Sequence, residues 1–170
     1  MPKVSSKADK TMYMTARERL HLTREKASRL IESQAGRIIS ADRLEKIENR
    51  RLTANPDEIL AIARAYKCPA MINYFCTHDC EIGDEHIREV QPKELSQIAI
   101  ETLNSLNKLT QVKDRLLEIV EDGVISEDEY EDFHSIKMNL EKIAGAVESL
   151  QLWLNESAVN GKVDMEKLSR

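Results

Sequence analysis

Apolar residues recur every three or four positions over most of this chain, a spacing that predicts amphipathic helices. In residues 12–76 the pattern is broken into five short segments. Thr23 and Ser40 are suited to cap the second and third helices, because their hydroxyls can accept from free backbone N–H groups. Asn55 followed by Pro56 is the clearest helix start in the chain and opens the fourth. We therefore expect five short helices around a small aliphatic core.

The second half of the chain carries longer patterns. Residues 93–122 predict one long helix that ends at Gly123, and Ser126 with Glu129 forms a capping box that opens another. In that helix apolar residues then recur at spacings of three and four over about three heptads. They are Phe133, Ile136, Leu140, Ile143, Val147, Leu150 and Leu154. Two such helices joined by a short turn should fold back antiparallel, and this seam should pack on a second copy or on the first domain. Seams of this length commonly dimerise, which favours a homodimer.

These patterns predict an all-α chain whose organisation follows the changes in periodicity. The expected parts are a flexible arm at 1–11, a helical domain at 12–76, a linker without periodicity at 77–92, an antiparallel helical hairpin at 93–155, and a tail at 156–170.

Composition supports the helical prediction. Hydrophobic residues make up 41% of the chain and aromatic residues only 4%, which suits aliphatic helix packing better than a sheet. The sequence holds neither an apolar run long enough to span a membrane nor a secretory signal. Three cysteines, an odd number, suggest reduced thiols. We expect a cytoplasmic protein.

The net charge of −5 is unevenly distributed along the chain. Residues 1–67 carry 15 Lys and Arg against 9 Asp and Glu, whereas residues 68–170 carry 10 against 21. The first part is therefore at +6 and the second at −11. A basic part of a chain can meet a polyanion, although a solvated surface explains the same charge equally well.

Residues 23–68 resemble the helix-turn-helix domain of the lambda-repressor-like, Cro-type (XRE) family of regulators. The resemblance rests on Thr23, on "ISADRLEKIENRR" as the reading helix and on "NPDEILAIARAYKCP" as the helix that packs behind it. It covers residues 12–76 and implies a five-helix lambda-repressor-like domain. In this family the third helix enters the major groove of double-stranded DNA and dimers read two half-sites. The resemblance therefore implies a sequence-specific, DNA-binding transcriptional regulator that acts as a homodimer.

The same resemblance implies a set of DNA-binding residues. Arg43 and Lys46 can donate to guanine edges or phosphates, and the arginines near the helix ends are suited to phosphates. The full set is Arg24, Ser40, Ala41, Asp42, Arg43, Lys46, Asn49, Arg50 and Arg51.

Two departures from the family weaken this interpretation. Asp42 and Glu45 would repel phosphates, although each could accept from the amino group of cytosine. The link "ESQAGRIIS" (residues 32–40) is longer than the family's tight turn, so it either displaces the third helix or adds a helical turn. The alternative is a protein-interaction adaptor that keeps the fold without strong DNA binding and binds a protein partner through the hairpin.

Cys68, Cys76, His78 and Cys80 place four potential metal ligands within thirteen residues. Their spacings differ from the paired C-x2-C pattern of structural zinc sites. A metal, a thiol switch and ordinary small core residues all remain open, and we expect no metal. A comparable "NYFC…C" segment is found in Firmicutes regulators of similar domain order, which implies kinship without assigning chemistry.

No enzyme motif is present, and the four histidines are scattered along the chain. The acidic segment around Gly123 lacks the oxygen spacing of a calcium loop. We therefore expect neither an enzyme nor a cofactor.

Overall fold

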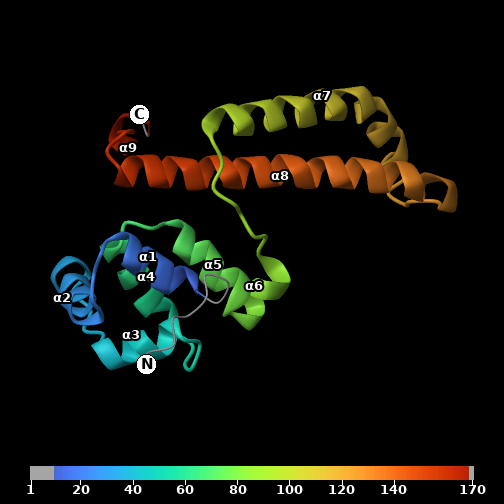
Figure 1. The fold of residues 1–170 in the computed structure, drawn as a ribbon. Coiled ribbons are helices and arrows are strands. Elements are labelled where there is room, and N and C mark those ends of the chain that lie inside the picture. The colour runs from blue at the N-terminus through green and yellow to red at the C-terminus, as the bar shows by residue number, and fades with distance from the viewer. Residues whose placement is uncertain (1–9, 169–170) are drawn as a thin grey trace. The chain divides into compact units, whose positions relative to one another are not determined.

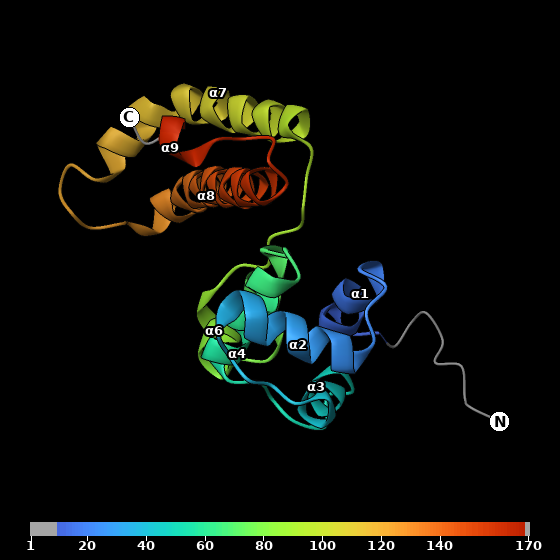
Figure 2. The same cartoon turned by 90° about the vertical axis from the view of Figure 1, so that its left-hand side faces the viewer.

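A computed structural model describes residues 10–168, and its regular structure is helical throughout that range, without a strand (Figures 1 and 2). This confirms the all-α prediction and the pair of long C-terminal helices. The chain divides into two compact units, one up to residue 89 together with residues from 155 onward, and one from 90 to 154. The expected arm at 1–11 lies almost wholly outside the described residues.

The first unit contains six short helices from the N-terminal part of the chain. They are α1 (Met12–Arg19), α2 (Arg24–Ala35), α3 (Ala41–Glu48), α4 (Pro56–Ala65), α5 (Ala70–His78) and α6 (Glu81–His86). Helix α2 packs against α3 and α4 (Figure 2), while α5 packs against α1, α4 and α6 (Figure 1).

Helices α2, α3 and α4 begin directly after their predicted capping residues, Thr23, Ser40 and Asn55. The Thr23 hydroxyl accepts from the backbone N–H of Lys26 at 3.3 Å, and the Ser40 hydroxyl accepts from that of Arg43 at 3.2 Å. At the start of α4, the Glu58 carboxylate accepts from the backbone N–H of Asn55 at 2.8 Å. Each bond satisfies an N–H group that the helix itself leaves unpaired.

An aliphatic core joins these helices. Leu44 and Ile47, the inward residues of α3, are each 2% exposed. They belong to one cluster with residues of every neighbouring helix, among them Ala27, Ile31, Ile39, Ile59, Ile62, Tyr66 and Met71. The apolar spacing of the sequence therefore decides which side of α3 is buried and which side remains outside.

Six residues of the expected linker form a helix instead, α6, although they lack helical periodicity. Gly83 permits this helix to lie against α5. A Cβ atom at Gly83 would stand 2.0 Å from the carbonyl oxygen of Cys76, so only glycine allows the approach.

The second unit is a helical hairpin made by α7 (Leu95–Ile119) and by α8 (Tyr130–Val159) as far as Leu154, and the two helices run antiparallel (Figures 1 and 2). At its turn the Arg115 guanidinium of α7 donates to Asp132 of α8 at 2.7 Å. The predicted capping box is confirmed, because the Ser126 backbone N–H donates to Glu129 at 3.0 Å just before α8. The short α9 (Met165–Leu168) follows α8 in the expected tail. None of the helices in residues 10–168 combines the length and apolar character needed to cross a bilayer.

The seven residues of the predicted seam do not share one environment. Ile136 is 1% exposed, and three others are half-buried: Phe133, Ile143 and Leu154. The remaining three are exposed: Leu140 at 45%, Val147 at 55% and Leu150 at 37%. The polar Asn139 and the small Ala146 are buried on the same helix, so the buried side of α8 is rotated away from the predicted seam.

Candidate nucleic-acid interface

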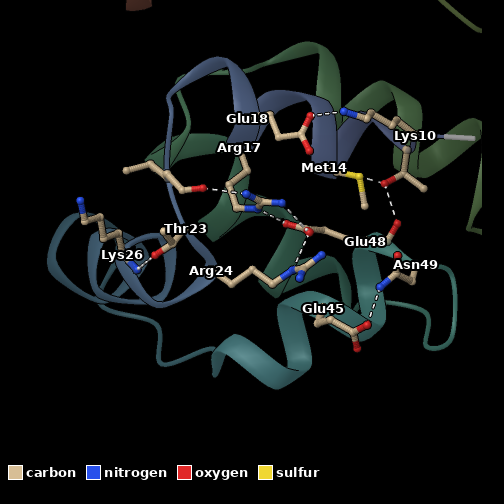
Figure 3. A network of polar contacts seen from close by, with 12 residues as sticks. Lys10, Met14, Arg17, Glu18, Thr23, Arg24, Lys26, Glu45, Glu48 and Asn49 are labelled. Atoms are coloured by element: carbon tan, nitrogen blue, oxygen red, sulfur yellow. Dashed lines mark hydrogen bonds and ion pairs between the residues drawn. The ribbon is translucent and has the colours of Figure 1, made fainter. Parts of the chain in front are cut away.

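A buried carboxylate holds the first three helices together (Figure 3). Glu48, at the end of α3, is 2% exposed and accepts from Arg17 of α1 at 2.6 and 3.0 Å. It also accepts from Arg24, the first residue of α2, at 2.9 Å. Arg17 donates in addition to the Leu22 carbonyl at 2.6 Å, and the Thr11 hydroxyl donates to the Glu48 carbonyl at 2.9 Å. The hydrogen bond to Glu48 raises the pKa of Arg17 above its usual value.

One residue of this network, Arg24, belongs to the predicted DNA-binding set. Two others, Arg17 and Glu48, were not among the predicted site residues. Arg24 was expected to contact phosphate, yet its guanidinium is engaged by Glu48 from α3. The resemblance implied no role for Arg17 or Glu48, although Glu48 is the second of the two glutamates in "RLEKIENRR" (residues 43–51). The signal available in the sequence was a carboxylate directly after the inward Ile47, on the side of α3 that meets other helices.

The outward side of α3 carries a stripe of polar residues at helical spacing. Asp42, Lys46 and Asn49 are exposed, and Glu45 lies between them, half-buried. They are paired with one another: Lys46 donates to Asp42 at 2.7 Å, and Asn49 donates to Glu45 at 2.6 Å. Arg51 also reaches Glu45, at 3.3 Å. The donors that could meet a duplex are therefore already occupied by acceptors of the same surface.

Arg43 turns away from this stripe toward α4. Its guanidinium donates two hydrogen bonds to Glu58, one of them from Nη2 at 2.7 Å. The hydrogen bond from Arg43 lowers the pKa of Glu58 and raises that of the guanidinium. Because Glu58 also closes the first turn of α4, this bidentate pair fixes α3 against α4. Arg43 therefore braces the fold, whereas the sequence suggested a contact with base edges.

Arg50 turns toward α5. It adopts a positive φ of 55°, and its guanidinium donates to the Tyr74 hydroxyl at 2.9 Å. The Tyr74 ring stacks on His78 at a centroid distance of 4.3 Å and meets Tyr13 edge-on at 5.5 Å. Of the predicted DNA-binding residues, then, Asp42, Lys46 and Asn49 lie together, and Arg43 and Arg50 lie to either side.

The link between α2 and α3 shows how the longer segment is accommodated. Helix α2 continues through Ala35, so four residues of "ESQAGRIIS" extend the helix and five form the connection. Gly36 ends α2 with a φ of 65°, and the buried Ile39 is fixed by the Ser28 hydroxyl, which donates to its carbonyl at 2.6 Å. Ile38 is 77% exposed. Ser40 then caps α3, with Ala41 half-buried beside it.

The cysteines lie beside the core of the first unit. Cys68 is buried, and Cys76 and Cys80 are half-buried against the same cluster. Burial raises the pKa of both Cys68 and Cys76, which keeps these thiols protonated at neutral pH. Across residues 10–168, no three His, Cys, Asp or Glu side chains are grouped so that they could hold a metal ion.

Compared with models of protein families, with curated proteins and with solved structures, the chain matches none of them. The chemistry of this surface therefore rests on its own residues. It offers a braced, capped helix whose outward groups are two carboxylates, one ammonium and one amide. Such a surface can donate or accept hydrogen bonds at base edges, but each contact of Lys46 with a phosphate requires the loss of an ion pair.

Proposed function

We propose that this chain is a sequence-specific, DNA-binding transcriptional regulator of the lambda-repressor-like kind, acting as a dimer through its C-terminal hairpin. In this proposal α3 is the reading helix of a helix-turn-helix domain, and the start of α2 lies against the DNA backbone. The observation that carries the proposal is the polar stripe of α3. It faces outward while Leu44 and Ile47 bury the opposite side of the same helix.

Two further features support the proposal. The charge of +6 on residues 1–67 favours approach to a polyanion. The contacts of Glu48 and Glu58 brace α3 from both sides, so the reading helix is rigid before it meets DNA. A preorganised helix loses less conformational entropy on binding.

A second function, a protein-interaction adaptor with weak or no DNA affinity, is favoured by a different observation. Asp42 neutralises Lys46, and Glu45 occupies Asn49 and Arg51, so little positive potential remains on the stripe. In an adaptor these groups would meet a polar protein surface instead of a duplex.

Charge changes of opposite sign on this one surface distinguish the two functions. The measurement is fluorescence anisotropy of a labelled random duplex at two salt concentrations. If α3 meets DNA, the double variant Asp42→Asn with Glu45→Gln binds more tightly, because it removes two repulsive charges. Lys46→Glu binds more weakly, and the slope of log K against log salt falls by about one unit.

The matched control is Lys108→Glu, which makes the same charge change on the exposed side of α7. It alters the net charge by the same amount as Lys46→Glu but leaves the α3 surface intact, so it should leave the affinity almost unchanged. Equal effects of Lys46→Glu and Lys108→Glu would mean that only net charge matters. No binding by any of these proteins would favour the adaptor. A selection of bound genomic fragments would then identify the sequence that is read.

A further inference from the structure

We infer that one face of the hairpin binds the same face of a second copy, with the acidic turns of the two hairpins at opposite ends of the dimer. This inference specifies the surface and the orientation of the dimer in the proposed function. It rests on the proposed function only for the biological purpose of the dimer. The face is defined by seven exposed apolar residues, and we name it the apolar face. They are Leu103, Leu106, Leu117, Val120, Leu140, Val147 and Leu150.

Helix geometry places these residues on the same side of the hairpin. In α7, Leu106 follows the buried Ser105, and Val120, the C-cap of α7, follows the buried Ile119. One residue corresponds to a rotation of about 100° around a helix axis. The apolar stripe is therefore offset by about 100° from the buried side of the helix.

The same offset occurs in α8, where Leu140 follows the buried Asn139 and Val147 follows the buried Ala146. The two helices are antiparallel and their buried sides face each other. Equal rotations in the same sense therefore turn both apolar stripes toward one face.

The exposure of this face is too large to be incidental. Leu103 is 60% exposed and Leu117 is 66% exposed, and no member of the face is below 37%. The face runs along α7 from Leu103 and along α8 from Leu140 to Leu150, so its apolar residues form a stripe on each helix. Contiguous apolar surface of this kind marks interaction sites.

The acidic turn of the hairpin favours one orientation of a second copy of the chain on the apolar face. Residues 118–132 around the turn contain eight Asp and Glu and no Lys or Arg. Two hairpins with their turns at the same end would bring sixteen carboxylates together. With the turns at opposite ends, about 37 Å of helix separates them, several times the Debye length of about 8 Å.

The opposite-ended arrangement also pairs charges along α8. Lys137 and Glu148 are exposed and lie about three helical turns apart. A two-fold axis that crosses α8 midway between them sets each lysine opposite the partner's glutamate. Hairpins with their turns together would instead leave both lysines at one end.

The first test is the mass of the full chain in solution, measured by sedimentation without DNA. We expect twice the 19.5 kDa of one chain, and one chain mass for Leu103→Glu with Val147→Glu at unchanged helical circular dichroism. Both residues are exposed, so these substitutions leave the hairpin core intact. The control is Ile82→Glu, which changes a residue of α6 that is 75% exposed and should remain dimeric.

The second test concerns orientation. Lys137→Glu and Glu148→Lys should each weaken the dimer, and the double variant should restore it. Failure of the double variant to recover would overturn the opposite-ended orientation. A monomeric wild type, or a dimeric Leu103→Glu with Val147→Glu variant, would overturn the apolar face as the interface. Each outcome is independent of DNA affinity, which the anisotropy measurement reports separately.

Discussion

Glu48 provides the most demanding quantitative prediction of this structure. In Glu48→Ala, the guanidinium of Arg17, whose side chain is 10% exposed, loses its carboxylate partner in the interior of the first unit. Breaking a buried ion pair by removing one partner costs about 3–5 kcal/mol. We expect the lower end, about 3 kcal/mol, because Arg24 can turn to water and Arg17 keeps the Leu22 carbonyl. For a chain of this length, that loss lowers the melting temperature by about 6–12 °C.

The assay is urea denaturation followed by far-UV circular dichroism, with fluorescence of Trp153 as a probe of the second unit. The control is Glu45→Ala, which removes a carboxylate from the same helix but from a surface pair, and should cost less than about 1 kcal/mol. Replacing the pair with apolar residues, Arg17→Met with Glu48→Leu, should cost less than Glu48→Ala alone, because the buried Arg17 charge is then removed and the more exposed Arg24 can turn to water. Equal losses for Glu48→Ala and Glu45→Ala would refute the reasoning.

Three further predictions concern other parts of the first unit. Gly83→Ala should lower the free energy of unfolding by about 1–3 kcal/mol in urea, because its Cβ would overlap the Cys76 carbonyl oxygen; an unchanged value would mean that α6 moves freely. Arg43 lowers the pKa of Glu58 below 4.5, so their pair stabilises the fold at and above that pH and is lost as pH falls through the lowered value; melting temperatures across that range should show this loss in wild type and not in Glu58→Gln. Tyr66→Phe should stabilise the protein by about 1 kcal/mol in thermal melts, because the buried hydroxyl has no hydrogen-bond partner among residues 10–168; a clear loss of stability would indicate a bound water.

The elements of this chain could be predicted closely, because the signals that start and stop helices are local. The hydroxyls of Thr23 and Ser40 bond to N–H groups three residues away, and the Ser126 box closes over the same distance. The three-residue spacing of Leu44 and Ile47 likewise puts both on one side of α3, and both are buried, because a side chain's face on a helix follows from its position in the sequence.

The candidate interface could be predicted only in part. Of the DNA-binding residues that the resemblance implies, Asp42, Lys46 and Asn49 lie together on the outward stripe of α3. The sequence could not show that Arg43 and Arg24 are engaged by Glu58 and Glu48, because those carboxylates are 15 and 24 residues away in sequence. The local sequence around an arginine on a helix surface is the same whether its side chain contacts solvent, a phosphate or a carboxylate of another helix.

By itself, the sequence determined the helices other than α6, the caps of α2, α3 and α4, and the separation of a basic part from an acidic part. The tertiary structure decided which cations remain available on α3 and which apolar residues of the hairpin remain exposed. Both depend on how one helix is rotated against another. A rotation by a single residue exchanges Asn139 for Leu140 on the buried side, and only the packing of whole helices selects between the two.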